Sequence, residues 1–140
     1  MSYRVLPHTA DVALEIYGRT WREFYLSAAA GLRAIYRPIG KSGKKELKRC
    51  RVREDSPEGV LVAWLNEMIF LISANRWFPE QVRLVDAGPT GLSAELTGGP
   101  MGSGRRRAVA VCAEVKSATF SDLAVRRYRG RWRARVVLDV

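Results

Sequence analysis

The segment from Ser56 to Ser73 constrains the fold most, because it has the pattern of a helix that is apolar on nearly every side. Ser56 is a suitable N-cap, Pro57 fits the first turn, and Glu58 complements the positive end of the helix dipole. A helix that is apolar all round has no face to offer to water. We therefore expect it at the buried centre of the fold, with the remaining elements packed around it.

A second helix is predicted from Trp21 to about Tyr36. Thr20 and Glu23 have the spacing of a capping box, in which the hydroxyl and the carboxylate each accept from a free backbone N–H. Strands are predicted where apolar residues alternate or form short runs: 12–16, 47–52, 81–86, 91–96, 108–119 (broken near Ala113), 123–128 and 132–138. Residues 41–45 read as a basic loop and 97–107 as a flexible glycine-rich loop.

Together these elements predict an α+β fold. Two helices pack on a mostly antiparallel sheet of about seven strands, and the last two strands form a hairpin around residues 129–131. At 140 residues the chain is expected to form a single domain spanning 1–140. Cys50 and Cys112 lack metal-ligand spacing and are expected to be reduced.

The chain carries no apolar run long enough to span a membrane, and its N-terminus does not resemble a signal peptide. We therefore expect a cytoplasmic protein with no membrane partner. Its formal net charge is +10, from 24 basic and 14 acidic residues. Arginine clusters favour RNA as a partner. Genome composition or heat adaptation explains them as well, and no regularly interleaved aromatics indicate a single-strand groove.

The two ends of the chain carry oxygen donors in unusual places. Asp11 follows His8 and Thr9 near the start, while an apolar strand at the other end stops on Asp139 and the terminal Val140. Carboxylates and carbonyls are the ligands of hard cations such as Ca²⁺, Mg²⁺ or Mn²⁺. The competing interpretation is that Asp11 caps a turn and that Asp139 is a solvated residue paired with an arginine. The residues alone favour this second interpretation.

Four sequence blocks, in this order and at these distances, resemble the archease family: HTADV, VLVAWLNEMIFL, EVKSATF and WRARVVLDV. The resemblance covers essentially the whole chain. It implies a fold of nested strand-helix-strand-strand modules, which agrees with the predicted order of elements. It also implies a helper protein and not an enzyme: an activator of the RNA-splicing ligase that joins tRNA exon halves, promoting its guanylylation and repeated turnover. The alternative role is a chaperone of a tRNA cytosine methyltransferase, or direct weak contact with tRNA through the arginines.

With the resemblance, a cation site becomes the favoured interpretation of the two chain ends. The resemblance assigns Asp11, Asp139 and Val140 as ligands of one divalent cation, with Ca²⁺ expected first and Mg²⁺ or Mn²⁺ as alternatives. His8 is expected to orient a ligand, because oxygen-rich sites seldom use imidazole. Glu67 is expected to be a structural partner of an arginine or, less favoured, a carboxylate supporting the metal site.

Lys116 is the candidate for contacting the ligase. In the predicted strand it shares a face with Glu114 and Ala118, and a solvated lysine is an equally good interpretation. The chain also departs from the family pattern at several positions, by its basic charge and by these residues: Ala63, Ser117, Phe120 and Ser121. A metal-dependent hydrolase is the weakest hypothesis, because no nucleophile–base pair or phosphate-binding glycine motif is evident.

Overall fold

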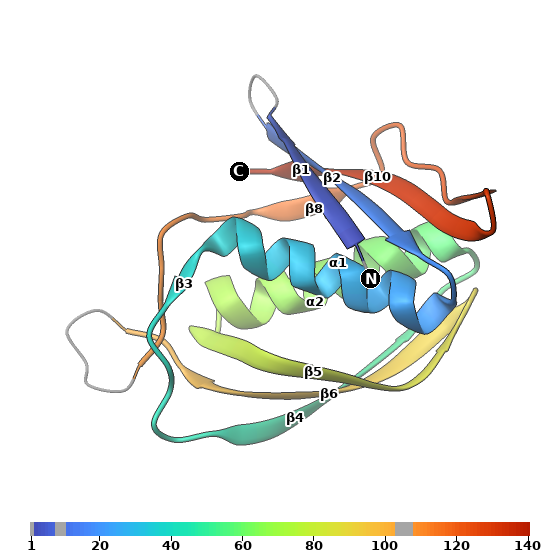
Figure 1. Ribbon diagram of the computed structural model, residues 1–140. Coiled ribbons are helices and arrows are strands. Elements are labelled where there is room, and N and C mark those ends of the chain that lie inside the picture. The colour runs from blue at the N-terminus through green and yellow to red at the C-terminus, as the bar shows by residue number, and fades with distance from the viewer. Residues whose placement is uncertain (1, 8–10, 103–107) are drawn as a thin grey trace.

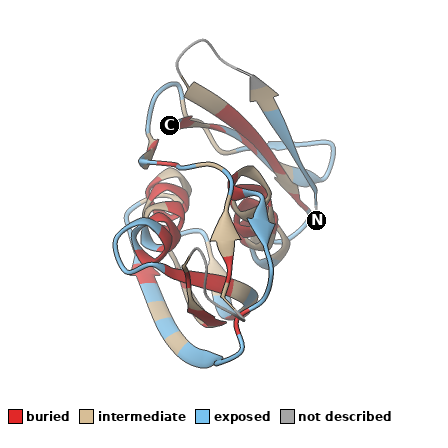
Figure 2. Cartoon of the chain, turned by 90° about the vertical axis from the view of Figure 1, so that its left-hand side faces the viewer, coloured by how far each residue is buried: buried red, intermediate tan, exposed pale blue. Residues whose placement is uncertain are grey.

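The computed structural model describes residues 2–7, 11–102 and 108–140, which form two helices and ten strands. The helices, α1 (Trp21–Tyr36) and α2 (Pro57–Ser73), run side by side between two larger sheets (Figures 1 and 2). One sheet has the order β1 (Ser2–Pro7), β2 (Asp11–Gly18), β10 (Arg131–Asp139) and β8 (Ser117–Thr119), and β9 (Arg126–Tyr128) also pairs with β10. The other has the order β4 (Glu46–Arg53), β6 (Gly91–Pro100) and β5 (Trp77–Gly88).

The predicted α+β class with two helices is confirmed, but the number of strands is larger than expected. β1 went unrecognised, and β3 (Pro38–Ile39) pairs with β7 (Ala110–Val111) in a small sheet of two residues per strand. Such short strands are too brief to show a period in the sequence. The run 108–119 is split into β7 and β8, close to the expected break. The hairpin between β9 and β10 is present, with Arg129 and Gly130 at positive φ in its turn.

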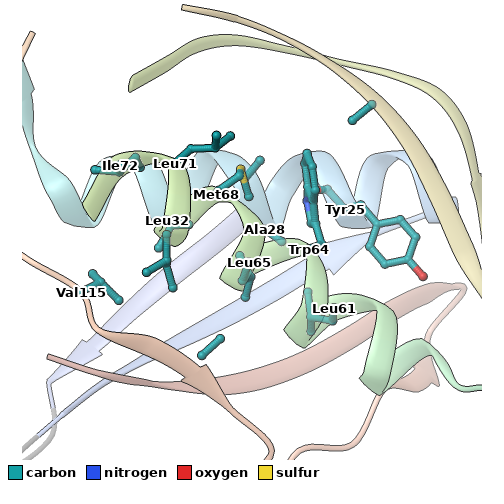
Figure 3. Close-up of a cluster of buried hydrophobic side chains, with 14 of the residues drawn as sticks. Tyr25, Ala28, Leu32, Leu61, Trp64, Leu65, Met68, Leu71, Ile72 and Val115 are labelled. Carbon is teal, nitrogen blue, oxygen red and sulfur yellow. The ribbon is translucent and has the colours of Figure 1, made fainter. Parts of the chain in front are cut away.

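Helix α2 occupies the expected central position. Ser56 Oγ accepts from Gly59 N at 3.1 Å and caps the helix, and Trp64, Leu65 and Met68 are fully buried. The apolar cluster between the two helices brings these residues against α1, as Figure 3 shows for Leu65 and Ala28. The Trp64 Nε1–H donates to the Tyr25 carbonyl at 3.0 Å, which satisfies the one polar atom of that ring.

Helix α1 begins at the predicted capping box, with one change in partner. Thr20 Oγ1 accepts from Glu23 N at 3.1 Å, while the Glu23 carboxylate accepts from Arg19 N, one residue before the cap. Trp21 in the first turn stacks on Trp132 of β10, with ring centroids 4.1 Å apart. This stack joins the start of α1 to the sheet that carries both chain ends.

The expectation of a flexible loop from Thr97 onwards was wrong for its first part, because β6 continues to Pro100. A Cβ on Gly98 would lie 1.9 Å from the Phe78 carbonyl oxygen, and one on Gly99 would lie 1.9 Å from Ser42 Oγ. Glycine is needed there for close packing of neighbouring segments and not for mobility. Residues 103–107 of the predicted loop lie outside the described part of the chain. Among the described helices, neither is long and apolar enough to cross a membrane.

A side-chain amide joins the central helix to the edge of the β1–β2–β10–β8 sheet. Asn66 Nδ2 donates to the Ala118 carbonyl at 3.2 Å, and Ala118 N donates to Asn66 Oδ1 at 2.7 Å. The amide therefore takes the place of a neighbouring strand for β8. Because it satisfies a donor and an acceptor of the backbone at once, its loss leaves two polar groups unpaired.

We expect Asn66→Ala to lower the free energy of unfolding by about 1–3 kcal/mol, measured by urea denaturation. The matched control is Asn75→Ala, at an exposed position after α2, which is expected to change stability by less than about 0.5 kcal/mol. Equal losses in the two variants would show that the amide does not hold β8 in place.

Candidate functional site at the paired chain ends

The pairing of β2 with β10 brings the two ends of the chain together. The strands are antiparallel, and their register places Asp11 directly opposite Asp139 and Val12 opposite Leu138. Opposed residues in such a ladder have Cα atoms about 4.5–5.5 Å apart and side chains on the same face. Leu138 is fully buried, so its face is the core face, and the two aspartates lie on the outer face. Figure 1 shows the C-terminal end at the start of β2.

A third segment completes this edge of the sheet. β8 pairs with the other side of β10, with Ser117 opposite Asp139, and Lys116 N donates to the Asp139 carbonyl at 2.7 Å. Asp139 is therefore fixed between Asp11 on one side and the start of β8 on the other. The terminal Val140 follows it and is 41% exposed.

The predicted placement of Lys116 inside a strand was wrong. Lys116 is exposed and lies just before β8, whereas Ala118, expected on the same face, is buried. The Val115 carbonyl, just before Lys116, accepts from the hydroxyls of Tyr36 and Ser73, each at 3.3 Å, and not from a neighbouring strand. The strand therefore begins only at Ser117. The Lys116 backbone nevertheless contacts Asp139, so the two candidates are neighbours.

The two residues expected to support the cation fall in different places. His8 and the adjoining Thr9 lie outside the described residues. Glu67 is exposed on α2, and within the described residues it makes no ion pair. Burial, together with the Glu67 carboxylate, raises the pKa of the Cys50 thiol of β4 to about 12. Glu67 thus belongs to the side of the β4–β6–β5 sheet, while Asp11 belongs to the other sheet. Cys50 and Cys112 are both free, as expected.

A hollow of about 250 Å³ opens beside Asp11, and it contains residues that sequence reasoning did not select for the site. Its lining comes from β2, β10 and the turn after β8: Asp11, Ser121, Asp122, Arg135 and Val137. Asp122 adopts a positive φ of 52° in that turn. A Ser-Asp pair shortly after a strand is a turn signal, but it does not reveal that the turn folds back towards Asp11.

The donors at this edge fit a hard cation with few protein ligands. Asp11 and Asp139 provide carboxylate oxygens on one face, and Val140 follows Asp139 in the chain. In the described part of the chain no three His, Cys, Asp or Glu side chains cluster as a metal site. Oxygen donors without thiolate or a cluster of imidazoles suit Ca²⁺, Mg²⁺ or Mn²⁺ better than Zn²⁺.

Further along the same outer face, Glu15 is buried among hydrogen-bond donors. Its Oε2 accepts from Tyr17 Oη at 2.7 Å and from Arg4 Nη2 at 2.9 Å, and the residue is only 6% exposed. The hydrogen bond from Tyr17 and then that from Arg4 hold the pKa of Glu15 below its ordinary value of 4.5.

The lowered pKa predicts a loss of stability in acid. Because the unfolded chain binds this proton more readily, the contribution of Glu15 is present above about pH 4.5 and disappears as pH falls through the folded pKa. We expect Glu15→Gln to flatten the fall in unfolding free energy between about pH 5 and 3. Glu54→Gln, at an exposed position, controls for the loss of one negative charge. An unchanged acid slope in Glu15→Gln would contradict the assignment.

Comparison with known proteins gives one consistent family. The model of the Archease protein family matches residues 3–140. An archease of Archaeoglobus fulgidus is 28% identical over the full length of both chains, and one of Pyrobaculum neutrophilum is 27% identical over 99% of this chain and 95% of its own.

Two solved structures share the fold. One, described as an archease and possible chaperone, from Thermotoga maritima, has a TM-score of 0.66 at 20% identity and covers 96% of this chain and 94% of its own. The other is a solution structure of a Methanobacterium thermoautotrophicum protein with a TM-score of 0.65 at 24% identity, covering 99% and 98%. With the family model matched from residue 3 to the last residue, the chain belongs to the archease family.

Proposed function

We propose that this protein is a metal-binding cofactor of the RNA-splicing ligase, which promotes guanylylation of the ligase and its repeated turnover in tRNA splicing. The observation that carries the proposal is the register that sets Asp11 opposite Asp139 beside the chain terminus. Membership of the archease family, whose members are expected to activate a ligase, is consistent with a pair of carboxylates at one edge of the sheet. On this proposal the chain is an activator and performs no catalysis of its own.

The cation would be held by Asp11, Asp139 and a carbonyl or carboxylate oxygen of Val140, with Ca²⁺ first and Mg²⁺ or Mn²⁺ as alternatives. Once bound, it supplies positive charge that phosphate groups of the ligase's nucleotide can approach, and nucleotidyl transfer depends mainly on positioning and charge neutralisation. With so few acidic ligands, the affinity is expected to be modest.

The chain's own residues around this edge provide a surface for the ligase. Lys116 is exposed and its backbone is bonded to Asp139, so a partner that reaches the aspartates also meets the lysine. Phe120, 61% exposed at the end of β8, adds an apolar side chain nearby. We propose that these two residues contact the ligase while the aspartates face its active site.

The test is multiple-turnover RNA ligation by the cognate ligase with GTP and Mn²⁺. We expect the wild-type protein to stimulate turnover and Asp139→Asn to lose most of the stimulation, because the amide removes one charge and one good oxygen ligand. Asp86→Asn is the matched control, since Asp86 is exposed on β5 in the opposite sheet. It is expected to stimulate as well as the wild type.

Three outcomes separate the alternatives. Stimulation that survives Asp139→Asn would keep the activator role and reject the site. Equal loss in Asp139→Asn and Asp86→Asn would indicate a general effect of charge. A ligase that turns over equally well with and without the protein would reject the activator role and favour the alternative, a chaperone of a tRNA methyltransferase. The Thermotoga relative is described only as a possible chaperone.

A further inference from the structure

The outer edge of β10 has a gap in its pairing. β8 covers residues 137–139 and β9 covers residues 131–133, while residues 120–125 loop away between them. At this gap lies a hollow of about 290 Å³, near the lower end of the range for small-molecule pockets, roughly 300 Å³. The residues that matter in its lining are Asp122, Arg126, Arg127, Tyr128, Arg133 and Arg135. Four arginine residues therefore line one hollow.

Aromatic rings hold several arginines of this hairpin in place. Arg127 lies over the Trp132 ring at 5.1 Å, and Arg133 lies over the Tyr17 ring at 5.8 Å. Arg131, two residues before Arg133 in the strand, lies over the same tyrosine at 4.6 Å. Trp132 is itself stacked on Trp21, so the support reaches back to α1. A guanidinium already oriented by a ring loses less conformational entropy when it binds a ligand.

Carboxylates do little to neutralise the positive charge of the hollow within the described residues, where the charge of Arg133 contributes to the lowered pKa of Glu15. None of its four arginines makes an ion pair with a carboxylate, whereas Arg4, Arg49 and Arg83 elsewhere do. The Glu15 carboxylate on the same face is already bonded by Arg4 and Tyr17. Asp122 is the one acid in the lining, so the hollow is lined by four basic residues and one acidic residue. Such a concave excess of positive charge attracts anions.

We propose that this hollow binds the phosphodiester backbone of RNA. Guanidinium forks match phosphate oxygens in geometry, and Tyr128, 53% exposed at the rim, offers a ring on which a base can stack. An anionic membrane surface would need a broad exposed face and would have no use for the hollow or the ring. The concave shape and the aromatic rim therefore favour RNA.

The position of the hollow indicates where a bound RNA strand continues. Asp122 and Arg135 line both this hollow and the one beside Asp11, so the two adjoin. A strand held by the arginines can thus continue towards the edge formed by Asp11 and Asp139. The binding itself does not depend on the ligase or on a cation, and the test below uses neither.

The experiment is fluorescence anisotropy with fluorescein-labelled tRNA and the purified protein, across about 50 to 200 mM salt. The pocket variant is Arg126→Gln with Arg133→Gln, and the matched control is Arg51→Gln with Arg53→Gln on exposed positions of β4. Both variants lose two positive charges. We expect the pocket variant to bind about 10- to 30-fold more weakly at 100 mM salt, with a salt dependence shallower by about 1 per lost contact. The control is expected to bind within about threefold of the wild type.

A third variant, Tyr128→Ala, tests the rim, and we expect it to weaken binding about tenfold at every salt concentration because stacking is not ionic. Equal losses in the pocket variant and the β4 control would overturn the proposal, since binding would then follow net charge alone. It would also be overturned by no measurable tRNA binding, or by sedimentation with phosphatidylglycerol vesicles that the pocket variant loses while its tRNA affinity stays unchanged. Thermal unfolding of each variant confirms that the protein is folded.

Discussion

The register between β2 and β10 is the constraint on which the candidate site depends. Leu14 and Val136 are opposed on the core face and fully buried, and a slip of one residue would turn both towards solvent. Each such exposure costs about 1.5–3 kcal/mol, and the other core residues of both strands would add to it. The same register sets Asp11 opposite Asp139. Burial of the apolar face therefore fixes the geometry of the polar edge.

The central helix α2 fixes the position of β8, the third segment at this edge of the sheet. Asn66 of α2 bonds both backbone groups of Ala118, which holds β8 beside β10 and so places Lys116 against Asp139. The sequence drew attention to Glu67, its neighbour, as the unusual polar residue of the helix. The structure shows that Asn66 faces the sheet that carries the chain ends, whereas Glu67 lies towards the β4–β6–β5 sheet. One polar residue in an apolar helix signals a specific contact, but the sequence does not tell which of two adjacent residues makes it.

Local signals predicted the elements well, and long-range packing decided the rest. Thr20 and Ser56 act as N-caps as their types suggested, because capping depends on residues three positions apart. Gly98 and Gly99 have the local pattern of loop residues, because their packing partners, Phe78 and Ser42, lie far away in sequence. The proximity of Asp11 and Asp139 was expected only through the family resemblance. The residues alone favour the simpler interpretation, in which Asp11 caps a turn and Asp139 is solvated.

The arginines show the same limit in a different way. No aromatic residues alternate with them regularly in the sequence, so the sequence does not predict a groove for single-stranded RNA. In the fold, Tyr17 of β2 lies under Arg131 and Arg133 of β10, and Tyr128 stands at the rim of the hollow. The sheet thus brings arginines and aromatic rings from distant segments together, although they do not alternate in the sequence. Its outer face has an acidic edge at the chain ends and a basic hollow beside it.

The central claim is that Asp11 and Asp139 act on one cation. The most direct measurement is a double-mutant cycle of Ca²⁺ affinity by isothermal titration calorimetry, with Asp11→Asn, Asp139→Asn and the double variant. If the two carboxylates share one ion, either change alone removes most of the binding energy and the second adds little, giving an interaction energy above about 0.5 kcal/mol. Losses that add independently, or Ca²⁺ affinity that no variant changes, would contradict a site built from both ends of the chain.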